Sequence, residues 1–182
     1  EDGTYIIEVQ YFADMINDMT FDNIYHEHVM YYTIHSLINL FNKHEMNVYR
    51  VEKIPTHGGS IRVYISEEIE IQQSVIELIN EERKNGIDKL QTMEKFNDKL
   101  QNNINEIREL FERLNKENKK IFGYGAPAKA TTALNFFGIS NEIDCIIEDN
   151  KLKQGKIIPG VNIPIISKEN IKKKEAPNKE KK

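Results

Sequence analysis

The densest group of ionisable side chains in the sequence is the run Tyr25-His26-Glu27-His28. Histidine suits general acid–base catalysis because its ordinary pKa, about 6.5, lies near physiological pH. A carboxylate beside it can orient the ring, and a phenol can donate a hydrogen bond to a developing oxyanion. The run therefore predicts proton transfer on a polar substrate. A polar turn with satisfied hydrogen bonds, or a metal pair formed by the two histidines, would fit the same residues, although no third metal ligand is obvious.

A second group of functional residue types lies in the loop at 55–60 and at Arg62, two positions beyond it. Backbone amides that no side chain covers, a hydroxyl and a guanidinium would stand together there, and such groups bind anions. A flexible hairpin turn explains the same residues equally well. The candidate anion-binding residues of this loop are His57, Gly59, Ser60 and Arg62.

A glycine loop, Gly123-Tyr124-Gly125-Ala126, follows a short apolar run and precedes a helical stretch. Glycines let the backbone approach a phosphate at a helix N-terminus, and Lys129 adds a positive charge. Position 128 holds Ala instead of the third glycine of the dinucleotide pattern, a change that the pattern tolerates. Glu148 and Asp149 follow the next apolar run, where an acidic ribose ligand would lie. This arrangement predicts nucleotide contact, but one glycine loop alone is weakly specific.

Strands and one helix are expected to position the residues of the first third of the chain. Residues 4–9 are β-branched and aromatic, which predicts a buried strand with no partner nearby in the sequence, as if the chain were part of a longer protein. Apolar residues recur at helical spacing over residues 33–43, with Thr33 as N-cap. Residues 46–51 and 61–65 alternate in polarity, so we expect two antiparallel strands joined by the glycine loop.

From residue 66 to residue 119 the sequence holds no proline and a single glycine. Over residues 90–114 apolar residues recur every three or four positions, which predicts a long helix with one apolar stripe. The stripe is expected to pack against another domain or a second subunit. From Lys120 an apolar run, a glycine loop, a helical stretch and a second apolar run predict a parallel βαβ unit. Residues 163–166 predict a further short strand.

The composition excludes several classes of protein. The 182 residues carry a net charge of −4, and residues 168–182 alone carry seven Lys and three Glu, which leaves −8 for the rest. A body of that sign argues against nucleic-acid binding. The sequence contains no run of about 18 apolar residues, so no membrane span is predicted. The single cysteine, Cys145, cannot form an internal disulfide. We therefore expect a cytoplasmic protein without a metal centre.

Several of these blocks, in this order, resemble the C-terminal part of the S-adenosylmethionine-dependent sugar C-methyltransferases. The resemblance lies in residues 3–9, 21–28, 37–41, 55–64, 123–132, 148–150, 153–156 and 159–160. It implies that a methyl group moves from S-adenosylmethionine to a carbon next to the ketone of a nucleotide-linked deoxy-sugar. The fold that it implies is α/β: an incomplete Rossmann-like βαβ domain, preceded by a strand and hairpin segment and a long helix.

The resemblance also divides the chain. Residues 1–66 would hold the end of a methyl-donor domain and the active-site segment, 67–119 a helical connector, 120–167 a truncated Rossmann-like domain and 168–182 a disordered Lys-rich tail. S-adenosylmethionine would be bound mainly by a region absent from this chain, so we expect the 182 residues alone to be inactive. A homo-oligomer could form through the long helix.

Finally, the resemblance implies a role for each motif. His28 would be the general base that removes the proton next to the ketone. Tyr25 and Glu27 would hold the sugar or steady the enolate, and His26 would support them. The nucleotide diphosphate would be bound by the first glycine loop with Arg62 and by Gly123, Gly125, Ala126 and Lys129. Two alternatives stay open: a non-catalytic nucleotide-binding module, and an interaction protein built on the long helix.

Overall fold

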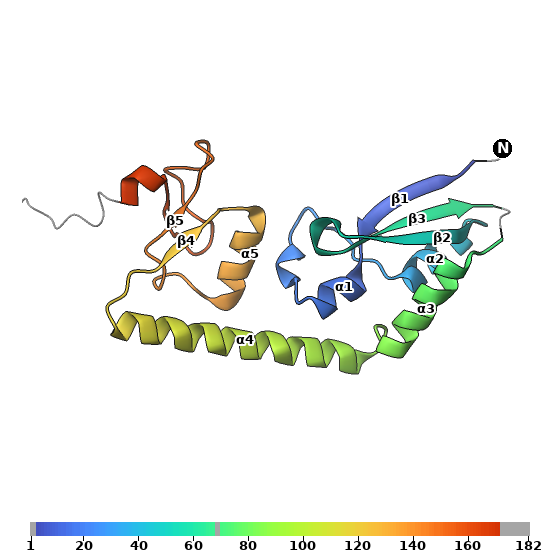
Figure 1. The fold of residues 1–182 in the computed structure, drawn as a ribbon, viewed down its shortest axis with the longest axis horizontal. Coiled ribbons are helices and arrows are strands. Elements are labelled where there is room, and N and C mark those ends of the chain that lie inside the picture. Colours follow the sequence, from blue (N-terminus) through green and yellow to red (C-terminus); the bar gives the residue numbers. More distant parts are fainter. Residues whose placement is uncertain (1–2, 68–69, 172–182) are drawn as a thin grey trace, which may run out of the picture. The chain divides into compact units, whose positions relative to one another are not determined.

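The computed structural model describes residues 3–67 and 70–171. The chain forms two compact units, unit 1 (Glu1–Phe21 and His26–Leu100) and unit 2 (Asp22–Tyr25 and Gln101–Lys182). Unit 1 contains an antiparallel three-stranded sheet and unit 2 a parallel one, and one long helix contributes residues to both units (Figure 1). The α/β fold expected from the sequence is confirmed.

The sheet of unit 1 has the strand order β1-β3-β2, built from β1 (Tyr5–Gln10), β2 (Asn47–Ile54) and β3 (Ser60–Ser66). Both pairs of neighbouring strands are antiparallel. The 3-10 turn η2 (Thr56–Gly58) joins β2 to β3, as the alternating polarity and the glycine loop predicted.

The strand expected at residues 4–9 is confirmed, but the expectation that it is buried is wrong for its first residues. β1 exists, but Tyr5 is 63% exposed and Ile6 is 58% exposed. Its partner is β3, far along the sequence, with Glu8 opposite Arg62 and Gln10 opposite Ser60. β-branched and aromatic residues favour a strand, but they do not indicate which side chains are buried when the strand lies at the edge of a sheet, as β1 does.

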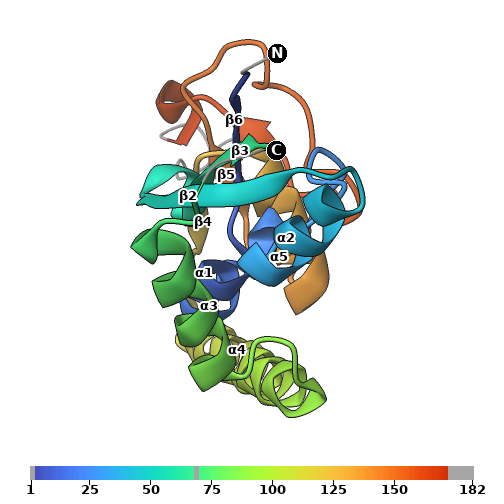
Figure 2. The ribbon, with the colours of Figure 1, turned by 90° about the vertical axis from the view of Figure 1, so that its right-hand side faces the viewer.

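The two faces of this sheet differ in chemistry. Alternate residues of a strand point to opposite faces, so β3 presents Ile61, Val63 and Ile65 to one face and polar side chains to the other. The apolar face packs against α2 (Ile34–Asn42) and α3 (Gln73–Asn85), which lie on the same side of the sheet in Figure 2. The polar face is therefore the one on which a ligand could find hydrogen-bonding groups.

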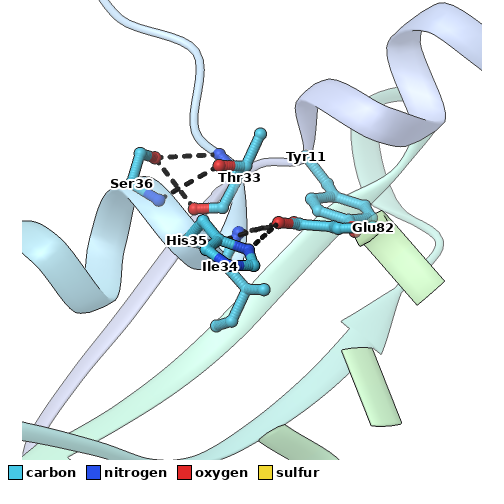
Figure 3. A network of polar contacts seen from close by, with 6 residues as sticks. All are labelled: Tyr11, Thr33, Ile34, His35, Ser36 and Glu82. Carbon is cyan, nitrogen blue, oxygen red and sulfur yellow. Dashed lines mark hydrogen bonds and ion pairs between the residues drawn. The ribbon is translucent and has the colours of Figure 1, made fainter. Parts of the chain in front are cut away.

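A buried carboxylate fixes the beginning of α2. Glu82 of α3 is 4% exposed, and its Oε1 accepts hydrogen bonds from the Tyr11 hydroxyl at 3.0 Å and from the Ile34 backbone N–H at 2.6 Å (Figure 3). Its Oε2 accepts from the His35 backbone N–H at 3.3 Å. Burial and the nearby charge of Glu82 raise the pKa of Tyr11 far above its usual range. A carboxylate also interacts favourably with the N-terminal end of a helix.

Thr33 caps α2, as its position in the sequence predicted. Its side-chain oxygen accepts a hydrogen bond from the Ser36 backbone N–H at 3.1 Å, and the Ser36 hydroxyl oxygen accepts from the Thr33 backbone N–H at 3.0 Å. Together with Glu82, this capping box sets the direction from which residues 28–32 enter the helix. These residues run beside the end of β1, where Tyr11 forms a bridge with Tyr32.

The remaining elements of the first part of the chain are short. Helix α1 (Phe12–Asn17) follows β1 directly, and the 3-10 turn η1 (Phe21–Asn23) precedes the Tyr-His-Glu-His run. The run itself is not a strand or a helix but a bend and turn. The strict alternation of faces that an extended segment would show therefore does not apply to it.

The predicted long helix is α4 (Leu90–Lys116). Leu100 and Ile104 are buried, and Ile107 and Phe111 pack against the core of unit 2. Leu90, the first residue of the predicted stripe, is 72% exposed. The stripe therefore serves the core of the chain itself over its later turns, and the homo-oligomer stays a prediction.

Unit 2 contains the predicted parallel βαβ arrangement. Its sheet has the order β4-β5-β6, from β4 (Phe122–Tyr124), β5 (Cys145–Ile147) and β6 (Ile165–Ile166), and α5 (Ala128–Phe137) connects the first two strands. The last element is the 3-10 turn η3 (Lys168–Asn170). The predicted Lys-rich tail begins in this turn, and its residues from 172 onward lie outside the described part of the chain. The proposed domain boundaries stay predictions.

Candidate active site

A hollow of about 480 Å³ lies beside the end of β1 in unit 1. One wall comes from the last residues of β1 and the first residue of β3, and the other from residues 27–32. The lining residues are Glu8, Val9, Gln10, Glu27, His28, Val29, Met30, Tyr32 and Ser60. Its volume lies within the range of small-molecule sites, and it contains two of the four predicted catalytic residues.

His28 and Tyr25 are the half-buried members of the predicted catalytic run, and of these two only His28 lines the hollow. Its ring lies 6.3 Å from the ring of Tyr31, at an angle of 43°. The backbone at Tyr32 is held in place because its carbonyl accepts a hydrogen bond from the Phe12 N–H at 2.9 Å. The imidazole is therefore presented to the hollow by a segment that is tied to α1.

The other members of the run are placed differently. Glu27 is exposed and lines the hollow together with His28, whereas His26 is exposed and does not line it. Tyr25 belongs to unit 2 and does not line the hollow. The structure thus brings His28 and Glu27 to one concave surface.

Ser60, a predicted substrate-binding residue, reaches the same hollow from β3. Its hydroxyl donates a hydrogen bond to the Thr56 carbonyl at 3.2 Å, which holds it at the end of the η2 turn. Opposite it in the sheet stands Gln10, which is 8% exposed. Antiparallel partners point to the same face of a sheet, so these two polar residues share the polar face.

Gln10 was not singled out by the sequence motifs. Both polar atoms of its carboxamide, Nε2 and Oε1, are buried and have no hydrogen-bond partner among the described residues. A buried polar group left unpaired costs about 1–3 kcal/mol. The sequence offered one indication: Gln10 lies two residues after Glu8 at the end of β1, so the two polar side chains point to the same face of the strand.

Arg62, predicted to bind an anion, is engaged by carboxylates of its own sheet. Its guanidinium lies 2.8 Å from Glu8 and 3.9 Å from Glu52, and the hydrogen bond to Glu8 raises the pKa of Arg62. Glu8 also accepts a hydrogen bond from the Thr56 hydroxyl at 3.0 Å. The charge of Arg62 is therefore balanced within the polar face, and Arg62 does not line the hollow.

The first glycine loop is shaped by its packing. Gly59 has a φ of +110°, and a Cβ atom there would lie 2.5 Å from the Cβ of Asp14. Gly58 and Gly59 lie in a shallow depression with Asp14 and Asp18, and burial raises the pKa of Asp14. Lys53 lines the same depression and lies 3.7 Å from Asp14, so groups of both charges stand beside these amides. His57 lies in the η2 turn of this loop, and its role stays a prediction.

The second glycine loop already binds a carboxylate. Glu148 accepts hydrogen bonds from the backbone N–H groups of Ala126 at 2.8 Å and of Asn150 at 2.9 Å, and these bonds lower its pKa. Lys153 donates to the Ala126 carbonyl at 2.7 Å and lies 3.9 Å from Glu148. The glycine motif predicts that the Ala126 N–H binds a phosphate. An incoming phosphate would therefore have to displace Glu148 from this N–H.

The glycines of this loop have structural roles as well. A Cβ atom at Gly123 would lie 2.3 Å from Cδ1 of Ile146, so a larger residue there would require the end of the Ile146 side chain to move. Gly125 has a φ of +87° and donates its N–H to the Ile147 carbonyl at 2.7 Å. Lys129 is half-buried in the first turn of α5. Nucleotide binding by this loop stays a prediction.

Neither a metal-binding cluster nor a membrane-spanning helix occurs among the described residues. Within residues 3–67 and 70–171, no three side chains of His, Cys, Asp or Glu lie close enough together to hold a metal ion. None of the helices in the same ranges has the length and apolar character needed to cross a membrane.

The observed α/β fold agrees with the one that the motif resemblance implied. Residues 55–178 match the family described as the C-methyltransferase C-terminal domain, and the chain belongs to this family. It is 37% identical over 172 residues to the C-methyltransferase NovU of Streptomyces niveus. The match covers 92% of this chain and 41% of NovU, so the chain spans less than half the length of this relative. The family resemblance predicted from the motifs is confirmed.

Proposed function

We propose that the chain forms the sugar-binding, base-supplying part of an enzyme that methylates a carbon next to the ketone of a nucleotide-linked deoxy-sugar. The observation that carries this proposal is the position of His28 in a chain of the C-methyltransferase family. A half-buried imidazole lines a hollow of about 480 Å³ together with Glu27 and Ser60. That hollow is large enough for a sugar ring.

In the proposed reaction the neutral imidazole of His28 accepts the proton from the carbon next to the ketone. The electron pair of the broken C–H bond moves toward the carbonyl oxygen and forms an enolate. Glu27 is exposed and lines the hollow, and a carboxylate there can accept a hydrogen bond from a sugar hydroxyl. The tilted contact with Tyr31 limits the orientations of the His28 ring, which favours alignment with the reacting carbon.

The methyl donor implied by the family is S-adenosylmethionine, which supplies an electrophilic methyl group when bound. The described residues do not fit its adenosine at the loop where a nucleotide pattern occurs. Glu148 is bonded to backbone amides there, and Asp149 accepts a hydrogen bond from the Tyr124 hydroxyl at 2.5 Å. Because the match covers only 41% of NovU, we expect residues 1–182 alone to give no methylated product.

Proton removal can be tested separately from methyl transfer. A nucleotide-linked deoxy-keto-sugar, dTDP-4-keto-6-deoxyglucose, is incubated in D₂O with the protein as its gene encodes it, in the presence of S-adenosylhomocysteine. Exchange of deuterium for the proton next to the ketone is followed by NMR. We expect His28→Ala to slow this exchange about a hundredfold or more, because positioned general bases contribute 10²–10⁴-fold.

His44→Ala is the matched control, since His44 is exposed and lies outside the hollow. It should leave the exchange rate unchanged. Unchanged exchange in His28→Ala, or no exchange above the rate without enzyme in the wild type, would show that His28 is not the base.

A further inference from the structure

The carboxamide of Gln10 has three properties that the proposed function does not explain. It is 92% buried, its two polar atoms each expose less than 1 Å², and neither atom has a hydrogen-bond partner among the described residues. At the same time Gln10 lines the hollow that contains His28. Buried polar groups are nearly always paired, so an unpaired one beside a hollow calls for a missing partner.

The neighbouring polar groups of the sheet do not share this property. Ser60 donates to the Thr56 carbonyl, and Glu8 accepts hydrogen bonds from Thr56 and Arg62. Since no described residue hydrogen-bonds the Gln10 amide, a change of its rotamer toward the hollow breaks no hydrogen bond within residues 3–67 and 70–171. A new hydrogen bond to a ligand would favour such a rotation.

The chemistry of the hollow limits the missing partner. A carboxamide offers one acceptor and two N–H donors. A phosphate oxygen or a ketone oxygen would satisfy the donors alone, and Glu27 at the rim adds negative charge that repels a phosphate. A hydroxyl can donate to Oε1 as well as accept from Nε2, so unlike a ketone oxygen it can satisfy either polar atom, and it brings no charge into the hollow.

We propose that Gln10 is a specificity-determining residue that binds the hydroxyl group next to the ketone of the sugar. This inference rests on the proposed function, because it places the reacting end of the sugar beside His28. It adds a substrate feature: the enzyme would select sugars that carry a hydroxyl adjacent to the carbonyl over their deoxy analogues.

The test is the binding of two sugars by the protein as its gene encodes it, measured by titration calorimetry. The first is dTDP-4-keto-6-deoxyglucose, and the second is the same compound without the 3-hydroxyl. Gln10→Met keeps the side-chain length but removes the amide. We expect it to weaken binding of the first sugar about tenfold, which is the effect of one lost hydrogen bond, and to leave binding of the second unchanged.

Gln91→Met is the matched control, because Gln91 is exposed on α4 of the same unit. It should alter neither binding constant. Equal effects of Gln10→Met on the two sugars, or no effect on the first, would overturn the proposal while leaving His28 as the base. A discriminating Gln10→Met together with unchanged deuterium exchange in His28→Ala would instead overturn the catalytic proposal alone. If the wild-type protein binds neither sugar, both proposals are wrong.

Discussion

Two buried polar side chains of unit 1, Glu82 and Gln10, differ completely in their hydrogen bonding. Glu82 is 4% exposed and accepts hydrogen bonds from the Tyr11 hydroxyl and from the backbone N–H groups of Ile34 and His35. Gln10 is 8% exposed, and no described residue hydrogen-bonds its amide. Gln10 is followed directly by Tyr11, whose hydroxyl belongs to the Glu82 network. Adjacent residues thus carry a buried polar group with a hydrogen-bond partner and one without a partner among the described residues.

The comparison suggests how structural and functional polar groups can be distinguished in this chain. A buried group whose partners are all supplied by the chain stabilises the fold, and removing it should lower stability. A buried group without partners contributes nothing favourable to the unliganded fold, and removing it should affect ligand binding instead. Stability measurements on variants of unit 1 can therefore break or sharpen this distinction.

The largest effect is expected for Glu82→Ala. It leaves the Tyr11 hydroxyl and two backbone N–H groups at the start of α2 without their acceptor, so unit 1 should lose about 3 kcal/mol of unfolding free energy. Urea unfolding can be followed by the near-UV circular dichroism of tyrosine, because six of the eight tyrosines belong to unit 1. Glu77→Ala, at an exposed position of the same helix, should change stability by no more than about 0.5 kcal/mol. Similar losses in the two variants would mean that the Glu82 network does not stabilise the fold.

A smaller loss is expected for Tyr11→Phe. Its ring is fully buried, and the substitution removes only the hydroxyl that donates to Glu82 at 3.0 Å. Hydrogen bonds to charged groups contribute about 1.5 kcal/mol or somewhat more, and Glu82 would keep its backbone donors. Hydrogen exchange of the Val63 and Ile65 amides would report the change in the core of the sheet. Tyr5→Phe, at an exposed position, is the control, and an equal effect there would contradict the argument.

The third prediction concerns a variant that should keep or raise the stability of unit 1 instead of lowering it. Gln10→Met should leave the stability of unit 1 unchanged or raise it by up to about 1 kcal/mol, since it removes an unpaired buried amide without creating a cavity. The same urea titration measures it. A loss of more than about 1 kcal/mol would show that the Gln10 amide is paired in solution, and the contrast with Glu82 would then disappear.

Local patterns in the sequence predicted most of the local structure. The capped helix α2, the β2–β3 hairpin and the βαβ unit follow from spacing, a side-chain cap and glycine turns that lie close together in the chain. The pairing of β1 with β3 joins residues far apart in sequence, and alternation alone does not choose a partner.

The candidate site was predicted only in part for the same reason. His28, Glu27 and Ser60 could be singled out as functional residue types, and they line one hollow. The states of Gln10 and Arg62 depend on what lies opposite them in the sheet, which a single sequence does not reveal. Likewise, the acidic residue predicted for a ribose, Glu148, is bonded to the very amide predicted for a phosphate.

Glu148 extends the comparison to unit 2, because it is paired like Glu82 but its side chain is 13% exposed. The backbone N–H groups of Asn150 and Ala126 lower its pKa below the usual value of 4.5. A carboxyl group with a lowered pKa stabilises the fold fully above the unfolded-state pKa, and this contribution is lost as the pH falls through the folded-state value. The amide chemical shift of Ala126 should therefore titrate with a midpoint below 4.5, and Glu148→Gln should abolish that titration. A midpoint at or above 4.5 would mean that the carboxylate is not held by the loop, and the glycine loop would then be open to a phosphate after all.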